Sequence, residues 1–517
     1  MALVLRGTVL TFDADHRVLD PGAVYVGDDG RLAAVRGAEQ RPPAGFANAP
    51  VLDTGALVLP GLIDLHNHIA YNTLPLWEAP GVPYAHHDRW VDERHPPDYA
   101  TSITWPAKVL GQAAPAALLA YVAVKALVGG TTAIQGAPVT SRPVDGRLLR
   151  LIDHEKLPAG TDRVLTAALQ LDAEVLRTDR AAKLDGTRVL IYHVAEGKPG
   201  SVVHREFEEL EPCLRPGLIG VHATALTPQD FGHWQHAVTG VNSAERGTVV
   251  WSPLSNYWLY HTTTDVVAAH QQGLRIALGS DWSPSGTKHV LGELKVADAV
   301  NQHRFDGHFN DRELCDMVTA NPGDALATAW GPQVGRLRQG GLADLLVLER
   351  HAPRLDPYRN LITATERHVR LVLVDGRPRY GTPALMKAAG ATHTSALTVA
   401  GLARTVAVRQ PGSADAELEW PGVLRALAKV RRDPVAAWRS AQDALASWGG
   451  PLDDPEAPLA LFGDLPEGDV GAFAAAGEVP PDLVVPPLDG LVHDARYFAA
   501  VARSAVPELQ FLAEYYR

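Results

Sequence analysis

Residues 59–70, LPGLIDLHNHIA, decide the fold, because an apolar run typical of a buried strand ends in two histidines that are two positions apart. Side chains at positions i and i+2 of a β-strand point to the same face, so His66 and His68 would project into one space. A strand that only fills a core has no need of such a pair at its end. The pair therefore predicts a binding site there, provided that the rest of the chain supplies further ligands.

The composition sets limits on the class of protein. The chain has 517 residues, of which 46% are hydrophobic, enough for one large core and one or two appended domains. It contains neither a run of ~18 apolar residues nor a secretory signal, and its two cysteines cannot form a disulfide framework. The formal charge of −12 argues against a protein that neutralises phosphates. We therefore expect a cytoplasmic protein with neither a nucleic-acid nor a membrane partner.

Residues 59–334 alternate short apolar strands with helical stretches, which indicates βα units and a parallel sheet. Seven strands are recognisable, and we expect an eighth either hidden between Ala168 and Thr187 or degenerate. The seven are GLIDLHNH, GTTAIQG, RVLTAALQ, TRVLIYHVAEG, GLIGVHATAL, GTVVWSPLSN and LRIALGSDW.

The segments on either side of this α/β region have different sequence patterns. Residues 1–58 and 335–381 alternate and turn like two parts of one β module. Residues 382–517 are mixed and largely helical, with a run rich in proline, aspartate and glycine near PLDDPEAPLALFGDLPEGD. That last segment carries no chemical motif, so we expect no essential acid, base or metal ligand in it.

Polar residues recur at the carboxyl ends of the predicted strands. His66 and His68 end the first strand, and the other strand-end candidates are His193 (with Glu196 three residues later), His222 and Asp281. In a βα barrel these strand ends converge on one face, where active sites are built. Imidazole and carboxylate are ligands suited to zinc or another first-row metal, and such a metal can activate water. The pattern predicts a metal site formed by residues more than two hundred positions apart.

The same motifs resemble those of the amidohydrolase superfamily. LPGLIDLHNH is similar to the family's first-strand motif, YHVAEG to the His-x-x-Glu of its deaminase and triazine hydrolase branch, and GVHATAL, WSPLSNYWL and ALGSDWSPSG to the motifs of its last three strands. The resemblance covers residues 1–381 and implies an α/β fold, a (β/α)8 TIM-type barrel with a small split β-sandwich. It does not extend to residues 382–517.

The resemblance also implies roles for the strand-end residues. His66, His68, His193 and Asp281 would bind one divalent metal, with zinc ahead of iron. Glu196 would shuttle protons, His222 would orient the attacking water or polarise the substrate, and Asp281 would help to hold the attacking oxygen. Binuclear members use a bridging lysine, but Lys183 lies in helix-like sequence, a poor position for that role. A mononuclear site is therefore expected.

The expected activity is hydrolysis of a carbon–nitrogen bond other than a peptide bond, with deamination of a nitrogen heterocycle favoured by the His-x-x-Glu motif. A cyclic amidase, a hydrolytic dehalogenase of triazine type, a binuclear amidase or peptidase, and a non-catalytic scaffold related to the dihydropyrimidinases remain alternatives. The expected partner is a small-molecule substrate, and the expected assembly is a homodimer.

The long loop after the first strand is rich in aromatic residues and histidines. His86, His87 and His95 are metal-type residues there, although surface or lid positions are the simpler interpretation. Either rim packing or the wall of a flat substrate ring would account for the aromatic residues of this and other loops, namely Trp77, Tyr84, Trp90, Trp251, Tyr257, Trp258 and Trp282.

Overall fold

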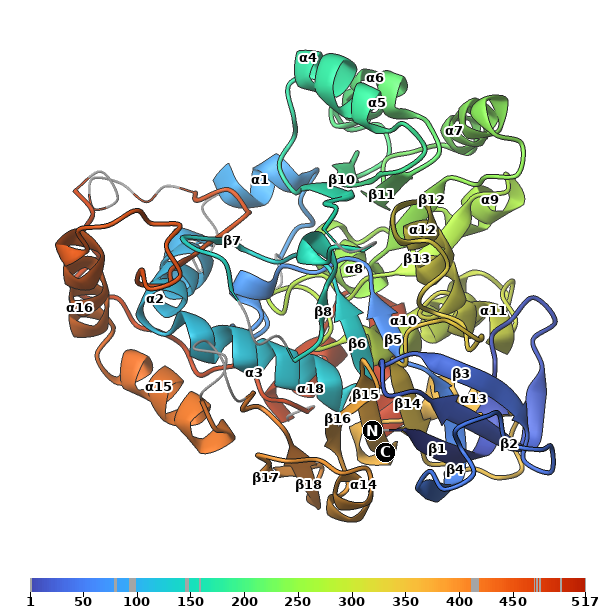
Figure 1. Cartoon of the computed structure of the whole chain (residues 1–517). Helices are drawn as coiled ribbons and strands as arrows, with labels where there is room; N and C mark the ends of the chain where they lie inside the picture. Colours follow the sequence, from blue (N-terminus) through green and yellow to red (C-terminus); the bar gives the residue numbers. More distant parts are fainter. Residues whose placement is uncertain are drawn as a thin grey trace.

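A computed structural model describes the chain over residues 2–78, 81–92, 99–144, 148–157, 160–410, 418–468, 470, 473, 476–492 and 495–516. Its architecture is α/β (Figure 1). Two parallel sheets and a long mixed sheet form its core, and helices cover them.

The two parallel sheets contain all seven strands expected from the sequence. One has the order β5-β6-β8, with β5 (Leu62–Asp64), β6 (Thr131–Ile134) and β8 (Arg150–Leu151). The other has the order β13-β12-β11-β10-β9, with β9 (Val164–Ala167), β10 (Val189–Val194), β11 (Leu218–His222), β12 (Thr248–Trp251) and β13 (Arg275–Leu278). They meet just beyond β5 and β13, where Asp281 N donates to His66 O at 3.0 Å. No ladder joins β8 to β9 within the described residues.

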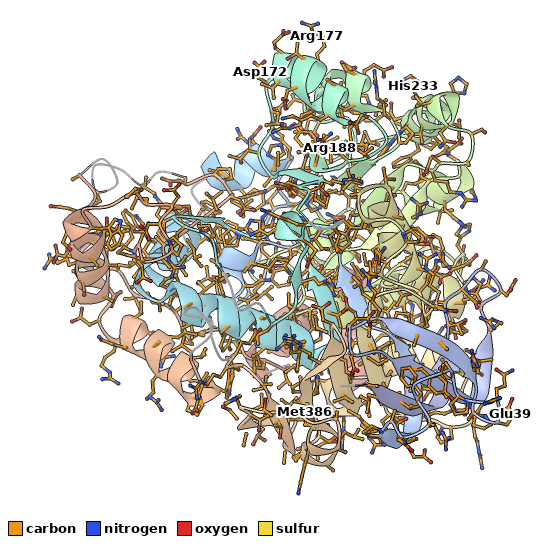
Figure 2. The ribbon with its side chains drawn as sticks, in the orientation of Figure 1. Glu39, Asp172, Arg177, Arg188, His233 and Met386 are labelled. Carbon is orange, nitrogen blue, oxygen red and sulfur yellow. The ribbon has the colours of Figure 1, made fainter. Side chains whose placement is uncertain are left out.

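Of the two alternatives for the eighth strand, the position between Ala168 and Thr187 is wrong, and a degenerate strand agrees with the structure. Residues 168–187 are largely helical, with α4 (Ala173–Val175), a π-helical turn over Leu176–Arg180 and α5 (Ala181–Lys183). Asp172 caps α4 by accepting from Glu174 N, and Figure 2 shows Asp172 and Arg177 at the outer edge of the molecule. The additional parallel strand is β8, whose two residues are too few to produce a recognisable apolar pattern.

The long sheet joins segments from both ends of the chain. Its order is β17-β18-β16-β15-β14-β4-β1-β2-β3. Its first strands are β1 (Leu3–Leu10), β2 (Val18–Val26), β3 (Leu32–Gly37) and β4 (Val51–Pro60), and the later ones are β14 (Leu345–Leu348), β15 (Val369–Val374), β16 (Arg377–Gly381), β17 (Ser395–Val399) and β18 (Leu402–Val406). β17 and β18 come from the segment expected to be a mixed helical extension. The β texture therefore continues beyond residue 381.

Helices cover the sheets. They are α1 (His87–Asp92), α2 (Trp105–Ala113), α3 (Pro115–Val128), α6 (His204–Glu209), α7 (Pro228–Val241), α8 (Pro253–Tyr260), α9 (Val266–Gln271), α10 (Val290–Arg304), α11 (Asp311–Asp316), α12 (Ala320–Trp330), α13 (Pro357–Thr363) and α14 (Pro383–Ala388). The C-terminal segment adds α15 (Trp420–Arg432), α16 (Pro434–Ser447), α18 (Ala495–Ala502) and α19 (Pro507–Gln510). α15 packs against α3 and α16 against α2, on the left of Figure 1.

In the described part of the chain no single helix is long and apolar enough to cross a membrane, although Ala100–Ala113 and Pro115–Val128, bent by 110°, together meet that test by length and composition.

The C-terminal segment also adds a short strand, which contacts α2 as α16 does. β19 (Leu461–Phe462) pairs antiparallel with β7 (Val139–Thr140), which lies in the loop after β6. The pairing brings residues near position 464 beside the loops that follow the parallel strands. The C-terminal segment is therefore packed around the carboxyl ends of those strands.

Candidate metal centre

The carboxyl ends of four parallel strands deliver five residues to one place. We call these residues, His66, His68, His193, His222 and Asp281, the metal group. Two of them have a left-handed backbone, at φ 64° for His222 and 57° for Asp281. Such conformations are uncommon for residues other than glycine and are concentrated at functional sites. All the ligand residues expected from the sequence are thus brought together.

The distances within the metal group suit a tetrahedral cation. His66 Nε2 lies 3.2 Å and His68 Nε2 3.6 Å from Asp281 Oδ1. The edge of a tetrahedron with bonds of about 2.1 Å is about 3.4 Å, so these separations are those of ligands around one zinc-sized ion. His193 also lies beside these rings, with its centroid 4.7 Å from that of His66 and 5.4 Å from that of His68. In each of two triplets, His66–His193–His222 and His66–His68–Asp281, the ligand atoms lie within 4.8 Å of one another.

The buried polar atoms of this group are incompletely satisfied by the protein. His66 is 1% exposed, and neither of its ring nitrogens makes a hydrogen bond with a described residue. A buried polar group without a partner is costly, and such a group in a native protein calls for a ligand or an ion. The orphaned imidazole, the surrounding nitrogen and carboxylate donors and their spacing fit a divalent metal of the zinc type.

Hydrogen bonds distinguish the roles of His68 and His222. His68 Nδ1 lies 3.0 Å from Asp464 Oδ2, and because a carboxylate accepts, this nitrogen donates, so that Nε2 is the ring nitrogen that faces the metal group. His222 Nδ1 instead accepts from Asn256 Nδ2 at 3.0 Å, so a neutral His222 carries its proton on Nε2. The side of His222 that faces the group is thus a hydrogen-bond donor. The two tautomers separate a ligand from a residue suited to hold oxygen.

Burial and neighbouring charges shift the pKa values of the metal group in different directions. Burial, followed by repulsion from the other histidines, lowers the pKa of His193 well below its usual range. Burial also lowers the pKa of His222 well below its usual range, against the opposing charge of Asp281. Burial would lower the pKa of His68 too, but the charge and hydrogen bond of Asp464 outweigh it and raise the pKa to about 9. Burial opposes ionisation of Asp281, but the charge of His66 prevails and holds its pKa below its usual range.

Glu196 lies beside the metal group and not within it. It follows β10 by two residues, after Ala195 in a left-handed conformation (φ 47°). Its Oε1 accepts from Tyr260 Oη at 2.7 Å and lies 3.7 Å from His222 Nε2. Burial raises the pKa of Glu196 to about 7. A carboxyl group with such a pKa can both accept and release a proton near neutrality.

Close approach of β13 to β5 requires a glycine. A Cβ on Gly279 would lie 2.4 Å from the Cβ of His66, a distance that real side chains do not reach. Gly279 therefore allows the two strand ends to touch, which places Asp281 next to His66. This explains the glycine in the stretch ALGSD.

The aromatic residues of the loops divide into two sets. Trp90 lies beside Trp282, with centroids 5.6 Å apart, and donates from Nε1 to Tyr260 Oη, which in turn holds Glu196. Trp77 stacks on Tyr84 at 6.3 Å. Trp251 packs instead against Phe305 and donates to Thr263, away from the metal group. The first set is a wall beside the candidate site, whereas Trp251 belongs to the packing of the rim.

Other metal-type residues expected from the sequence lie apart from the group. Lys183 ends α5 and pairs with Asp179 at 2.8 Å, so it bridges nothing in the centre. His87 is bound by Glu206 at 2.9 Å, and His86 forms an isolated bridge with Gly197. His95 lies outside the described residues.

Sequence reasoning missed three residues that contact the site: Tyr260, Asn256 and Asp464. Asn256 lies within the stretch WSPLSNYWL, which resembled a family motif although no role was given to this residue, and Tyr260 directly follows that stretch on the same helix, α8. Asp464 lies far along the chain in a segment with no motif. No sequence signal indicates it.

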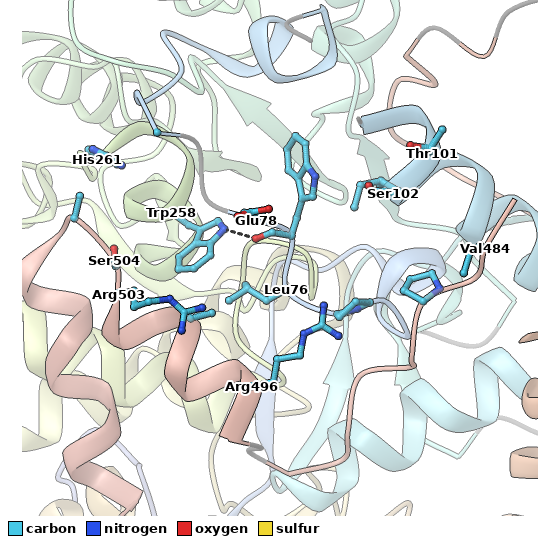
Figure 3. A pocket seen from close by; sticks show the side chains of 17 residues that line it. Leu76, Glu78, Thr101, Ser102, Trp258, His261, Val484, Arg496, Arg503 and Ser504 are labelled. Carbon is cyan, nitrogen blue, oxygen red and sulfur yellow. Dashed lines mark hydrogen bonds between the residues drawn. The ribbon is translucent and has the colours of Figure 1, made fainter. Parts of the chain in front are cut away.

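A cavity of about 730 Å³ opens beside the aromatic loop (Figure 3). Its walls come from residues 75–78, from α8 and from the C-terminal segment, including Arg496 and Arg503. Trp258 Nε1 donates to Trp77 O at 3.1 Å and closes one side. No member of the metal group lines this cavity, so it lies outside the metal centre.

No family model matches the chain, but known proteins resemble it in sequence and in fold. A 5-methylthioadenosine/S-adenosylhomocysteine deaminase of Syntrophobacter fumaroxidans is 28% identical over 422 residues, covering 72% of this chain and 92% of the relative. Two zinc-containing structures share the fold at 18% identity, each covering 73% of this chain. They are an adenosine deaminase from Xanthomonas campestris (TM-score 0.56, 92% of that chain) and atrazine chlorohydrolase from Arthrobacter aurescens TC1 (TM-score 0.53, 94% of that chain).

Proposed function

Because the chain belongs to the amidohydrolase superfamily and is a hydrolase of carbon–nitrogen bonds other than peptide bonds, we propose that it deaminates a nitrogen heterocycle with the help of one bound divalent metal. The relative from Syntrophobacter fumaroxidans is named for two adenosine derivatives. Purine nucleosides are therefore the first substrates to consider. The observation that carries the proposal is the buried His66: neither ring nitrogen makes a hydrogen bond with a described residue, and its Nε2 lies 3.2 Å from Asp281 Oδ1 amid other metal-type ligands.

The proposal includes a closed barrel. β13 lies beside the end of β5, and closure into a (β/α)8 barrel needs β8 to lie beside β9. Residues 59–334 would then form the barrel and residues 1–58 and 335–381 a split β-sandwich, to which β17 and β18 add two strands, and the rest of residues 382–517 would form an extension. Pairing of β4 with both β1 and β14 supports one β domain made from two segments. A homodimer and a cytoplasmic location remain predictions.

We assign His66, His68, His193 and Asp281 to the metal and His222 to the oxygen that attacks. Zinc is preferred to iron, because the donor set is nitrogen and carboxylate and two neighbouring structures hold zinc. Zinc bound there supplies Lewis-acid chemistry that makes water a nucleophile at neutral pH.

The protein's own residues move the protons. Glu196, with its pKa raised to about 7 by burial, takes a proton from the attacking water and returns it to the leaving amine. Tyr260 fixes Glu196 by donating to Oε1, and Trp90 fixes Tyr260. His222 donates from Nε2 towards the attacking oxygen, because Asn256 occupies its other nitrogen. The buried aromatic wall keeps bulk water away from these groups.

Ammonia release tests the proposal. Zinc-loaded protein is incubated with adenosine, 5′-deoxyadenosine, 5-methylthioadenosine, S-adenosylhomocysteine, guanine and cytosine, and metal-stripped protein is the control. Ammonia release from one or more of these substrates, dependent on zinc, is the expected result. Chloride release from a chlorotriazine or opening of a cyclic amide in its place would reject deamination and favour the corresponding hydrolase. Bound zinc without turnover on any of these compounds would favour the scaffold.

A further inference from the structure

The C-terminal segment supplies a carboxylate to the metal group. Asp464 Oδ2 lies 3.0 Å from His68 Nδ1, although the two residues are 396 positions apart. The His68 side chain is 3% exposed and that of Asp464 24%, so the contact is largely shielded from water. The other oxygen of Asp464, Oδ1, is buried and makes no hydrogen bond with a described residue. Within the described residues the carboxylate is therefore directed to His68 and not to its own segment.

Strand pairing brings Asp464 to this position. β19 pairs with β7 in the register Leu461–Thr140 and Phe462–Val139, and Asp464 follows β19 by two residues. Gly463 lies directly on Tyr71, since a Cβ there would be 2.2 Å from Tyr71 Oη. A side chain at position 463 would move the segment away from the site.

Backbone contacts hold the segment on the other side of Asp464. Tyr99 Oη donates to Pro466 O at 2.9 Å, and Thr104 Oγ1 donates to Glu467 O at 2.7 Å. These contacts do not use the side chain of Asp464. The segment is thus held in place independently of the carboxylate, which leaves the carboxylate available for a role at His68.

We propose that Asp464 is a positioning residue for the metal ligand His68, supplied by a segment that carries no recognised motif. This inference rests on the proposed metal-dependent function. By accepting from Nδ1, Asp464 fixes the tautomer and orientation of His68 and makes Nε2 a stronger donor to a metal. Carboxylates that bind metal-ligating histidines in this way typically contribute 10–100-fold to metal affinity.

The test measures zinc affinity directly, by competition with a chromogenic chelator. Asp464→Ala should weaken zinc binding about 10–100-fold, and the nearly isosteric Asp464→Asn should weaken it less, because an amide oxygen still accepts but carries no charge. Asp443→Asn, on an exposed face of α16, is the matched control and should leave affinity unchanged. The melting temperature of the metal-free protein should stay at the wild-type value in Asp464→Asn.

Two results would overturn the inference. Wild-type zinc affinity in both Asp464 variants would show that the hydrogen bond does not serve the metal. A lowered melting temperature of metal-free Asp464→Asn, with unchanged zinc affinity, would show that Asp464 only anchors its segment. Failure of the proposed function is distinguishable from both, because the wild-type protein itself would then bind no zinc, or would bind it equally well after His68→Ala.

Discussion

Two buried sets of ionisable side chains lie beside the loop that follows β5, and they are completed in different ways. In one, Asp489 accepts from Lys125 Nζ at 2.6 Å and Lys288 Nζ at 2.7 Å, and all three side chains are at most 6% exposed. Lys125 also donates to Asn72 O at 3.0 Å. In the other, the metal group, His66 has two buried nitrogens without a hydrogen bond to any described residue.

This difference distinguishes buried charges that stabilise the fold from buried charges that form a binding site. Burying charge is tolerated when the partners are present, and the protein supplies them around Asp489. A third set obeys the same rule, since Arg150 binds both oxygens of Asp344 and also Asp375. The metal group does not follow this rule, because its buried nitrogens are not all partnered by described residues. This is expected of a site whose remaining partner binds from outside the chain.

The largest expected effect comes from removing the orphaned ligand and its neighbour. Replacing His66 and His68 together with alanine should abolish stoichiometric metal binding, because half of the proposed ligands are lost, while wild-type protein should hold about one zinc per chain. Elemental analysis of protein purified in parallel measures both. The matched control is the double change of His233 and His236, two exposed histidines on α7, to alanine.

Two outcomes would contradict the contrast between the metal group and the set around Asp489. Metal retained by the His66 and His68 double variant would mean that the orphaned nitrogens are not ligands. Two tightly held metals per wild-type chain would contradict the mononuclear proposal, for which Lys183 offers no bridging position.

A substitution of Glu196 is expected to lower the reaction rate without changing metal binding. Glu196→Gln keeps the shape that Tyr260 holds but cannot accept and return a proton, so turnover should fall about 10²–10⁴-fold. Zinc content should stay at the wild-type value, since Glu196 is not among the proposed ligands. Single-turnover rates and zinc content are measured on one preparation, with Glu208→Gln on α6 as the exposed control. Wild-type turnover in Glu196→Gln would reject the proton-shuttle role.

Much of this arrangement could be predicted from the sequence, because strand ends carry information that is local. The run before His66 is apolar enough to indicate a buried strand, and His193, His222 and Asp281 each end a similar run. Their convergence then follows from the parallel α/β fold. The pattern indicated the group, and the structure brings its five members together.

What could not be predicted depends on contacts that leave no local pattern. β8 has only two residues, too few for a periodic pattern. Residues 168–187 form short helices in place of the expected strand. Asp464 and Asp489 are single acids in a segment of mixed composition, and only tertiary packing brings them to His68 and Lys125. Long-range pairs of this kind are invisible to periodicity.

The set around Asp489 should respond in stability and not in metal content. Asp489→Asn removes the carboxylate between two buried lysines, and breaking a buried ion pair costs about 3–5 kcal/mol. Urea unfolding should therefore show a free energy of unfolding lower by about 3 kcal/mol, with zinc per chain unchanged in the folded variant. Asp482→Asn, exposed in the same segment, is the control. Loss of zinc with unchanged stability would show that the set around Asp489 and the metal group do not differ in this way.

Asp316 provides a further test of the comparison, because it has a buried oxygen without a hydrogen bond but, among the described residues, belongs to no group of metal-type ligands. Its Oδ1 is buried without a hydrogen bond to a described residue, and its side chain is 14% exposed. Burial raises its pKa to about 7, against the opposing charges of Arg336 and Arg312, while Asp324 adds repulsion. His16, from the turn between β1 and β2, lies 3.9 Å away. One unpaired atom, in our interpretation, is a cost to stability and not a site.

The sign of that cost can be measured. An unfolded aspartate has a pKa of about 3.9, so between pH 4 and 7 the folded chain keeps a proton on Asp316 that the unfolded chain has lost. The free energy of unfolding therefore falls as the pH rises through this range, and the loss is complete above pH 7. Asp316→Asn carries no such charge, so in metal-free protein its stability relative to wild type should increase from pH 5 to pH 8, by about 1 kcal/mol for a partly exposed group. Urea unfolding at several pH values, with the exposed Asp15→Asn as control, measures the difference. If the stability difference between Asp316→Asn and the wild type does not change with pH, Asp316 already has adequate partners. The buried Oδ1 without a hydrogen bond would then not lower the stability.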